Sequence, residues 1–308
     1  MNIGKSMAGH TGLWYNADMS APAQRLRTSN HLLLIRLLAL VTLFQGFSSC
    51  ALVDLQPESA HIRNGVLDLR AWNPDTELVL NGSWQFAAGH MVHAGSQVAD
   101  GYWNEHIVPD QWQSGDGGGH DGQGYGTYRL QLLLPPAAGP LALRIRTIST
   151  ACELEVNGQV LYRAGRPGIA PGEAIPAFRP AVIDLPEGQS RLELLVRVSN
   201  WDYRTGGMWR ALTIGRQSDL AESKWLSDML AVFIGAALLA TGLNSFLIFL
   251  FRPGEQSFLW FSIFVLVMAI RTLVTGEYLG AAILPFEAMI RLEYMTTFAN
   301  LPACSLFL

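Results

Sequence analysis

The longest uncharged stretch of the chain, residues 229–251, is the feature that most limits how the chain can fold. After Asp228 there is no charged residue until Arg252. About 20 apolar residues are enough to cross the hydrocarbon core of a bilayer as an α-helix. We therefore predict a transmembrane helix over 226–251, with the 219–225 segment as a short connector before it and Trp225 as an aromatic anchor at the interface.

Two more apolar segments follow the first. Arg252–Gln256 is a polar turn whose proline and glycine end a helix. We predict a second transmembrane helix over 257–275 and a third over 286–308. The third segment is still apolar at Leu308, so we expect the chain to be a fragment of a longer membrane protein.

Charge is scarce in this chain. Charged residues make up 15% of it, against about 25% in an ordinary soluble domain. The deficit is concentrated after residue 226. Lysine occurs only at Lys5 and Lys224, and there is no basic cluster. Nucleic-acid binding is therefore excluded as a function class.

The N-terminal segments resemble export signals. Residues 1–30 are polar and are expected to be disordered. Residues 31–51 contain an apolar stretch with basic residues on its N-terminal side and small residues at its end, which is typical of a secretory signal peptide. An uncleaved anchor helix stays open as the alternative. Both interpretations export the segment that follows.

Residues 54–218 are predicted to be all-β, because short runs of alternating apolar residues recur between turn signals. Asn157-Gly158 is a strong two-residue hairpin turn. In 141–148, Leu143 and Ile145 alternate with Ala142 and Arg144, so we expect one buried face and one solvated face. A two-sheet sandwich is the expected architecture. Its predicted core aromatics are Trp84, Phe86, Trp112 and Tyr128.

Three groups of motifs give the chain a family resemblance. The first comprises Leu80–Phe86 (LNGSWQF), Val108–Trp112 (VPDQW) and Tyr125–Arg129 (YGTYR), which resemble the galactose-binding-like domain at the front of β-galactosidases. The second comprises Glu153–Gly158 (ELEVNG), Val198–Asn200 and Gly206-Gly207. The third comprises Arg271–Glu277 and Arg291–Tyr294. Together they resemble bacterial seven-transmembrane receptors with diverse intracellular signalling modules.

The resemblance implies a domain order. Such receptors have an exported jelly-roll sensor domain, seven helices and a cytoplasmic output such as a histidine kinase or a cyclase. For this chain it implies an all-β jelly-roll sandwich over 54–218, followed by an incomplete α-helical transmembrane bundle. The expected location is the bacterial inner membrane, with the sandwich in the periplasm. About four helices and the output domain of the family are missing from the sequence.

The segment 200–209 holds the best ligand-binding candidates. Sugar sites combine an aromatic face with forked polar groups, and this segment offers both types of side chain. The alternative is a loop that packs on the membrane-facing side of the sandwich. The candidate residues are Trp201, Asp202, Tyr203, Arg204 and Trp209.

Four charged residues lie in or beside the predicted second and third helices: Arg271, Glu277, Arg291 and Glu293. Charge in hydrocarbon is expensive, so such residues usually face partners or water. We expect Arg271 to pair with Glu277 or Glu293. Snorkelling toward the headgroups is the alternative.

No metal or cofactor is expected. Asp116 and Asp121 in the glycine-rich segment 115–126 are too few for a calcium site without carbonyl ligands. The histidines His90, His93, His106 and His120 lack the spacing of a zinc site. Cys50, Cys152 and Cys304 form no obvious disulfide pair. Glu153 and Glu155 share a strand face, which we expect to be exposed rather than catalytic.

The sequence therefore predicts a membrane sensor and not an enzyme. Its exported sandwich would bind a ligand, with carbohydrate as the candidate class, and would signal through the helices. The alternative is a membrane-anchored carbohydrate-binding or scaffold module without a signalling output. The expected partners are the lipid bilayer, a small ligand and, as a further candidate, a second copy of the chain.

Overall fold

The computed structural model describes residues 58–60, 62–96, 100–112, 122–136, 138–275 and 284–307. The chain divides into two units, Met1–Gln56 and Pro57–Leu308, and every element below belongs to the second unit. The predicted disordered segment 1–30 and the predicted signal peptide or anchor 31–51 lie outside the described residues.

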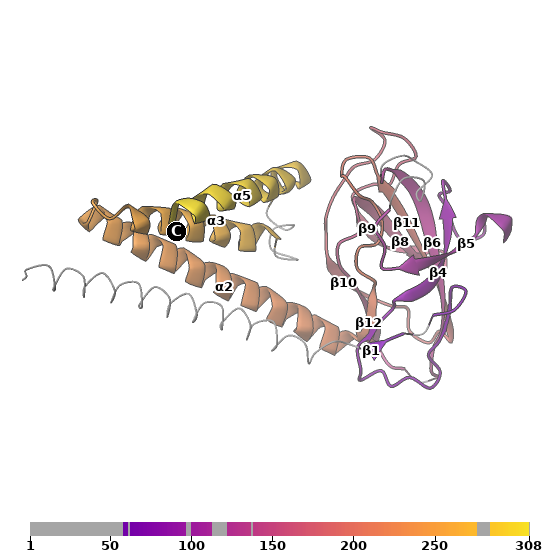
Figure 1. Cartoon of the computed structure of the whole chain (residues 1–308). Coiled ribbons are helices and arrows are strands. Elements are labelled where there is room, and N and C mark those ends of the chain that lie inside the picture. Colours follow the sequence, from indigo (N-terminus) through magenta and orange to yellow (C-terminus); the bar gives the residue numbers. More distant parts are fainter. Residues whose placement is uncertain are drawn as a thin grey trace, which may run out of the picture. The chain divides into compact units, whose positions relative to one another are not determined.

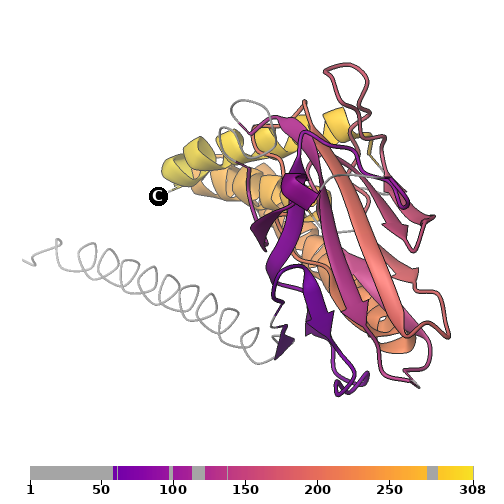
Figure 2. The same ribbon diagram turned by 90° about the vertical axis from the view of Figure 1, so that its right-hand side faces the viewer.

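The first part of this unit is a sandwich of two β-sheets (Figure 1). In spatial order, the first sheet contains β1 (Glu58–Ser59), β3 (Leu78–Val79), β12 (Thr213–Arg216), β7 (Leu141–Ile145) and β10 (Ala181–Asp184). The second sheet contains β5 (Asn104–Val108), β4 (Gly82–Ala88), β6 (Gly124–Leu133), β11 (Arg191–Asn200), β8 (Ala151–Val156) and β9 (Gln159–Ala164). Strand β2 (Val66–Asp68) pairs in parallel with β6, and a 3-10 turn, η2 (Asp100–Tyr102), precedes β5. The long strands β6 and β11 run side by side in Figure 2.

One hydrophobic cluster takes side chains from both sheets. Leu143 and Ile214 come from the first sheet, and Leu194 comes from the second. Each large apolar side chain buried in this way contributes about 1.5–3 kcal/mol. The two-sheet sandwich is therefore confirmed. All four predicted core aromatics are buried in the cluster: Trp84, Phe86, Trp112 and Tyr128.

The segment Leu78–Phe86 crosses from one sheet to the other. The chain forms β3 in the first sheet and β4 in the second. The break covers Leu80 and Asn81, and β4 begins at Gly82, whose φ of 133° is a conformation that favours glycine. A Cβ atom at this position would also lie 3.1 Å from the side chain of Ile62. Glycine therefore permits both the turn and the close approach.

The hairpin at Asn157-Gly158 is confirmed. Both residues have positive φ, 49° and 85°, as the tight two-residue turn requires. Val156 pairs with Gln159 directly across the turn, so β8 and β9 form an antiparallel hairpin.

Among the described residues, three helices follow the sandwich: α2 (Gln217–Phe251), α3 (Gln256–Thr275) and α5 (Phe286–Phe307). Within the described part of the chain, α2 and α3 are the two helices long and apolar enough to cross a membrane. Helix α5 begins where we predicted, but it carries Glu287, Arg291 and Glu293 in its first half and is not one of these two. A membrane crossing by α5 stays a prediction.

Helix α2 begins earlier than we predicted. The 219–225 segment, which we expected to be a connector, is helical, and Gln217 follows directly after the last residue of β12. Leu220 is fully buried in the first turn. A single helix therefore joins the sandwich to the apolar segment, without a flexible link between them.

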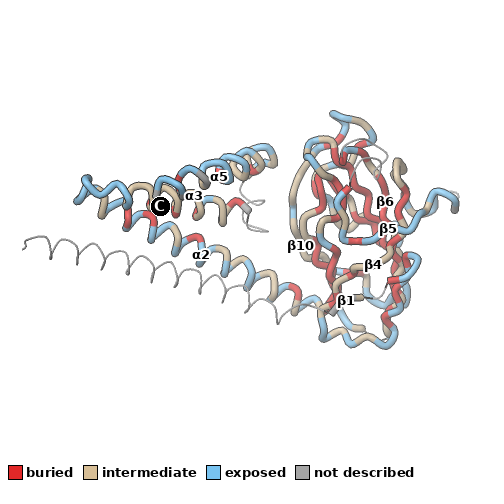
Figure 3. The backbone as a smooth tube through the Cα atoms, in the orientation of Figure 1, coloured by how far each residue is buried: buried red, intermediate tan, exposed pale blue. Residues whose placement is uncertain are grey.

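The expectation of a solvated face on β7 is wrong. All five residues of the strand are buried. The outer face of β7 packs against the first turns of α2, where Arg144 donates a hydrogen bond from Nη1 to the Ser223 hydroxyl at 3.0 Å. Figure 3 shows buried residues in the sandwich, whereas most of α2 is exposed or intermediate. The alternating pattern identified the strand correctly but gave no sign of the helix that covers it.

Helices α2 and α3 pack closely where α2 carries small residues. The Ser262 hydroxyl of α3 donates a hydrogen bond to the Gly242 carbonyl at 2.9 Å. A Cβ atom at Gly242 would lie 2.7 Å from the Leu266 side chain, and one at Gly235 would lie 2.7 Å from Leu273. Small residues that let two backbones approach are typical of helix pairs in membranes.

Candidate functional site

The predicted ligand loop 200–209 is held by Asn200, the last residue of β11. The Asn200 amide nitrogen donates hydrogen bonds to the carbonyls of Gly122 and Tyr203, each at 2.8 Å. Its amide oxygen accepts one from the Tyr203 backbone at 3.1 Å. Since Asn200 is fully buried, the start of this loop is fixed by the sandwich.

Two of the predicted ligand residues join an aromatic cluster at the beginning of α5. The ring centroids of Tyr203 and Trp209 lie 5.4 Å apart. Phe178 packs against both, and its ring lies 5.1 Å from that of Phe286 in α5. Phe178 thus connects the aromatic side chains of the loop to the start of α5. Ligand binding by the loop stays a prediction.

The other three predicted ligand residues are placed differently. Trp201 donates its indole N–H to the Gly168 carbonyl at 3.1 Å, and Asp202 and Arg204 are exposed. Burial, with a smaller contribution from the negative charge of Glu287, raises the pKa of Asp202. Burial likewise raises the pKa of Tyr203 to about 12. The packing of this loop against α5 therefore raises the pKa values of both side chains.

A group of charged side chains lies on the outer face of the second sheet, opposite the hydrophobic cluster. We call it the outer-face charge cluster. Its residues are Arg129, Glu193 and Arg197 on β6 and β11, and Glu153, Glu155 and Arg163 on β8 and β9.

Arg197 is the centre of this cluster and is buried, with 3% of its side chain exposed. It donates from Nη1 to Glu155 at 2.7 Å and forms an ion pair with Glu153. Arg163, which is mostly exposed, pairs with the other oxygen of Glu153. The expected exposed face at Glu153 and Glu155 is therefore wrong, because Glu155 is buried and Glu153 nearly so.

The loop Gly89–Ser96 covers this cluster. The Ala94 backbone donates to Glu155 Oε1 at 2.7 Å, and Arg197 donates to the Val92 carbonyl at 2.8 Å. Burial alone would raise the pKa of the Glu153 and Glu155 carboxyls. Hydrogen bonds from Arg197 to both, and from the Ala94 backbone to Glu155, outweigh burial and hold both pKa values below their ordinary value of 4.5.

A polar pocket of about 260 Å³ opens beside the cluster. We call it the outer-face pocket. Its rim is formed by the backbone and side chains of 92–96, and its walls are formed by Trp103, Arg129, Glu193 and Leu195. Arg129 donates from Nε to Glu193 Oε1 at 2.7 Å. Its guanidinium carbon lies 5.4 Å from the centre of the Trp103 ring, which is a cation–π distance.

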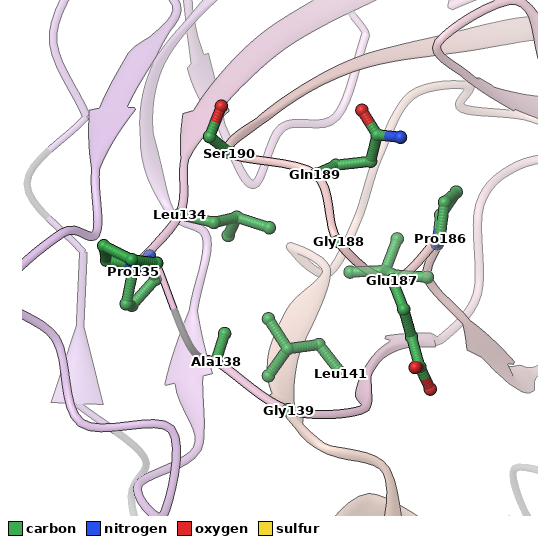
Figure 4. Close-up of a pocket in the computed structure, with 12 residues that line it drawn as sticks. Leu134, Pro135, Ala138, Gly139, Leu141, Pro186, Glu187, Gly188, Gln189 and Ser190 are labelled. Carbon is green, nitrogen blue, oxygen red and sulfur yellow. The ribbon is translucent and has the colours of Figure 1, made fainter.

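A second hollow of about 410 Å³ lies between the β6–β7 and β10–β11 loops. Figure 4 shows Leu134, Ala138 and Leu141 on one side and Pro186 and Gly188 on the other, with the Glu187 carboxylate pointing away from the space between them. We call this hollow the end cleft. It is lined mainly by proline, glycine and leucine. It offers fewer charged groups than the outer-face pocket.

The described residues contain no group of three or more potential metal ligands. His90 contacts the Ala88 carbonyl through Nδ1 at 2.7 Å, and His93 lies 3.4 Å from Glu155. His106 lies 2.7 Å from Asp110. Most of the glycine-rich segment, with Asp116, Asp121 and His120, lies outside the described residues.

Asp110 is the acceptor of a second buried network. It accepts hydrogen bonds from the Tyr128 hydroxyl at 2.6 Å and from the Met208 backbone at 2.8 Å. The Trp112 indole in turn donates to the Tyr128 oxygen at 2.7 Å. Burial and the neighbouring Asp110 charge raise the pKa of Tyr128 well above its ordinary value. These bonds satisfy polar groups inside the core, which is a structural role.

The charged residues of the helices make few carboxylate pairs. Arg271 contacts α5 by donating to the Glu293 carbonyl at 3.3 Å and to the Thr297 hydroxyl. The contact with Glu293 uses its backbone carbonyl. Pairing of Arg271 with the carboxylate of Glu277 or Glu293 stays a prediction. Arg291 pairs with Glu287 one turn earlier, at 3.2 Å, and both are exposed. Glu277 lies outside the described residues.

Our sequence reasoning missed Trp103, Arg129 and Glu193 as candidates. A signal was present, because Glu193 and Arg197 are four residues apart on β11 and therefore share one face of the sheet. Arg129 joins that face because it pairs with Leu195 between them. No sequence pattern shows that a loop covers that face and turns it into a pocket.

Comparisons with known proteins give limited similarity. No family model matches the chain, and no curated protein matches it. Among solved structures, β-glucuronidase 2 of Bacteroides uniformis is 20% identical over 45% of this chain and 17% of its own, with a TM-score of 0.36. A putative β-galactosidase of Bacteroides fragilis is 18% identical over 45% and 22%, with a TM-score of 0.33.

A β-glucuronidase of Ruminococcus gnavus is 16% identical over 45% of this chain and 28% of its own, with a TM-score of 0.34. The chain therefore matches less than a third of the length of these three proteins.

Proposed function

We propose that this chain is the sensor portion of a bacterial membrane receptor, of the seven-transmembrane type with diverse intracellular signalling modules. The periplasmic sandwich binds a ligand, and the helices carry the response into the inner membrane. One observation carries the proposal: helix α2 runs without a break from the last strand of the sandwich to Phe251.

The length of α2 supports a membrane crossing. Its 35 residues span about 52 Å at about 1.5 Å per residue. The hydrocarbon core of a bilayer takes about 30 Å of this length, or about 20 residues. The uncharged segment 229–251 supplies those residues, and 217–228 remains outside the hydrocarbon. Trp225 is exposed on that outer portion, where an interfacial aromatic anchor belongs.

The exposure of the apolar helices supports the same conclusion. Of the most apolar part of α2, 17% is buried, and of α3, 22% is buried. The core helix of a soluble protein would be mostly buried, whereas a helix in a bilayer presents its apolar side chains to lipid. Membrane crossing accounts for this exposure without a further protein partner.

The continuity of α2 favours a sensor over a plain anchored module. A flexible tether absorbs a movement of the domain it carries, whereas a helix packed on the sandwich transmits it. Arg144 and Leu220 fix the first turns of α2 to the first sheet. The Phe178–Phe286 contact gives the sandwich a second connection, to α5.

We assign no catalytic role to Glu153 and Glu155. A glycosidase needs one carboxylic acid with a raised pKa as its proton donor. Glu153 and Glu155 both have lowered pKa values and are held by Arg197. This arrangement suits a structural ion cluster.

The orientation is tested by cysteine labelling in intact cells. Glu173→Cys places a thiol on an exposed part of the sandwich, and Glu255→Cys places one in the exposed α2–α3 turn. We expect a membrane-impermeant maleimide to label Cys at 173 in intact cells and Cys at 255 only after permeabilisation. The unsubstituted chain gives the background from its own cysteines. Labelling in the reverse order, or release of the protein by alkaline carbonate, would overturn the proposal.

A further inference from the structure

We propose that the outer-face pocket binds a small neutral polyhydroxyl ligand, of the size of a single monosaccharide ring. The proposal rests on the sensor function proposed above, because it names the site and the ligand class of that sensor. It places the ligand on the outer face of the second sheet, away from the 200–209 loop. The residues that carry it are Trp103, Arg129 and Glu193.

The pairing of Arg129 with Glu193 creates a donor and an acceptor side by side. The Nε and Nη2 atoms of Arg129 both lie 2.7 Å from Glu193 Oε1. This pair uses two of the five N–H donors of the guanidinium and leaves Glu193 Oε2 as an acceptor. Two neighbouring hydroxyls of one ligand match this arrangement, because each hydroxyl both donates and accepts. Trp103 adds an apolar surface for the C–H groups of a ring.

The charges around the pocket favour a neutral ligand. The outer-face charge cluster contains three arginines, at 129, 163 and 197, and three glutamates, at 153, 155 and 193. Their formal charges cancel. An anionic ligand would bring a second negative charge beside Glu193, whose carboxylate is already paired with Arg129.

The rim of the pocket is fixed before a ligand arrives. Val92 donates its backbone N–H to the Thr127 hydroxyl at 2.9 Å, and its carbonyl accepts from Arg197 at 2.8 Å. The Ala94 backbone N–H donates a hydrogen bond to Glu155 Oε1 at 2.7 Å. A preformed rim reduces the entropy lost on binding. The ion pairs of Arg197 with Glu153 and Glu155 thus also hold the 92–94 backbone at the pocket.

The size of the pocket limits the ligand. Its 260 Å³ lies just below the range of about 300–1,000 Å³ typical of pockets for drug-sized molecules. A single sugar ring fits this space better than an oligosaccharide does. The larger end cleft has one charged lining residue, Glu187, and its carboxylate points away from the cleft.

The test is calorimetric titration of the full chain in lipid nanodiscs with D-glucose, D-galactose, D-mannose and D-glucuronate. We expect at least one of the neutral sugars to bind with a millimolar or lower Kd. Arg129→Gln and Trp103→Ala should each weaken that binding at least about tenfold. Arg191→Gln is the matched control, because Arg191 lies on the same face of β11, bonds to Gln131, and does not line the pocket.

The melting temperature of each variant shows whether it is folded. Glu193→Gln provides a second, smaller change at the Arg129–Glu193 pair. Weaker binding by folded Arg129 and Trp103 variants, with Arg191→Gln unchanged, supports the proposal. Three results would overturn it: no sugar binding by the parent chain, tighter binding of glucuronate, or loss of binding only on Trp201→Ala. None of these results changes the outcome of the orientation experiment, so the two proposals fail separately.

Discussion

The Arg144 guanidinium on strand β7 donates a hydrogen bond to the Ser223 hydroxyl on helix α2, at 3.0 Å. Arg144 is buried, although its strand pattern places it on the face that would otherwise be solvated. Its position marks where the sandwich and the helix share one interface. A displacement of β7 would therefore also displace the first turns of α2, because the two elements share this interface.

Leu220 is the apolar part of this interface and gives the first prediction. It is fully buried, so Leu220→Ala should cost about 2–5 kcal/mol, as for other large-to-small core changes. The first turns of α2 should then open more often. Trypsin cleavage after Lys224, measured by mass spectrometry, should increase because cleavage requires local unfolding of the helix.

Leu226→Ala is the control for this prediction, because Leu226 is exposed on the same helix. It should leave the cleavage rate near that of the parent chain. Equal rates for the two variants would show that Leu220 does not hold α2 to the sandwich.

Arg197 gives the second prediction. Arg197→Leu leaves Glu153 and Glu155 buried without their main partner, and breaking a buried pair in this way costs about 3–5 kcal/mol. Arg163→Gln removes a mostly exposed partner of Glu153 and should cost less than about 1 kcal/mol. Denaturant unfolding followed by tryptophan fluorescence measures both. Similar losses in the two variants would contradict the central role of Arg197.

Much of the sandwich was predictable because its strands have a local pattern. Asn157-Gly158 fixes the β8–β9 hairpin by backbone preference alone, and Trp84 and Tyr128 are buried where alternation places them. The burial of Arg144 was not predictable, because it depends on packing against Ser223 of α2, 79 residues later in the chain. Alternation indicates two faces but does not say what covers each of them.

The candidate site was missed for the same reason. Aromatic and polar residues adjacent in sequence, such as Trp201 and Tyr203, drew attention to one loop, yet their side chains have different partners. The outer-face pocket combines Trp103, Arg129 and Glu193 from three separate segments. The pairing of β6 with β11 joins Arg129 and Glu193, and Trp103 reaches them from the segment just before β5.

Gly242 gives the third prediction. Gly242→Leu places side-chain atoms where Leu266 of α3 already lies, within 2.7 Å of the new Cβ. Overpacking of this kind costs about 1–3 kcal/mol, so the melting temperature in detergent should fall. Ala236→Leu is the matched control, because Ala236 is exposed on the same helix. A smaller residue at 266 should partly restore the Gly242→Leu variant, and equal melting of the two single variants would exclude close α2–α3 packing.

The fourth prediction concerns acid. Folding lowers the pKa values of Glu153 and Glu155 below 4.5, so both carboxyls bind protons more weakly in the folded chain than in the unfolded one. Their contribution to stability is therefore complete above pH 4.5 and is lost as the pH falls through the lowered values. The free energy of unfolding, measured in denaturant between pH 7 and pH 3, should decrease in that window. The double variant Glu153→Gln, Glu155→Gln should start less stable and show a shallower decrease. An equally steep decrease would assign the acid sensitivity to other carboxyls.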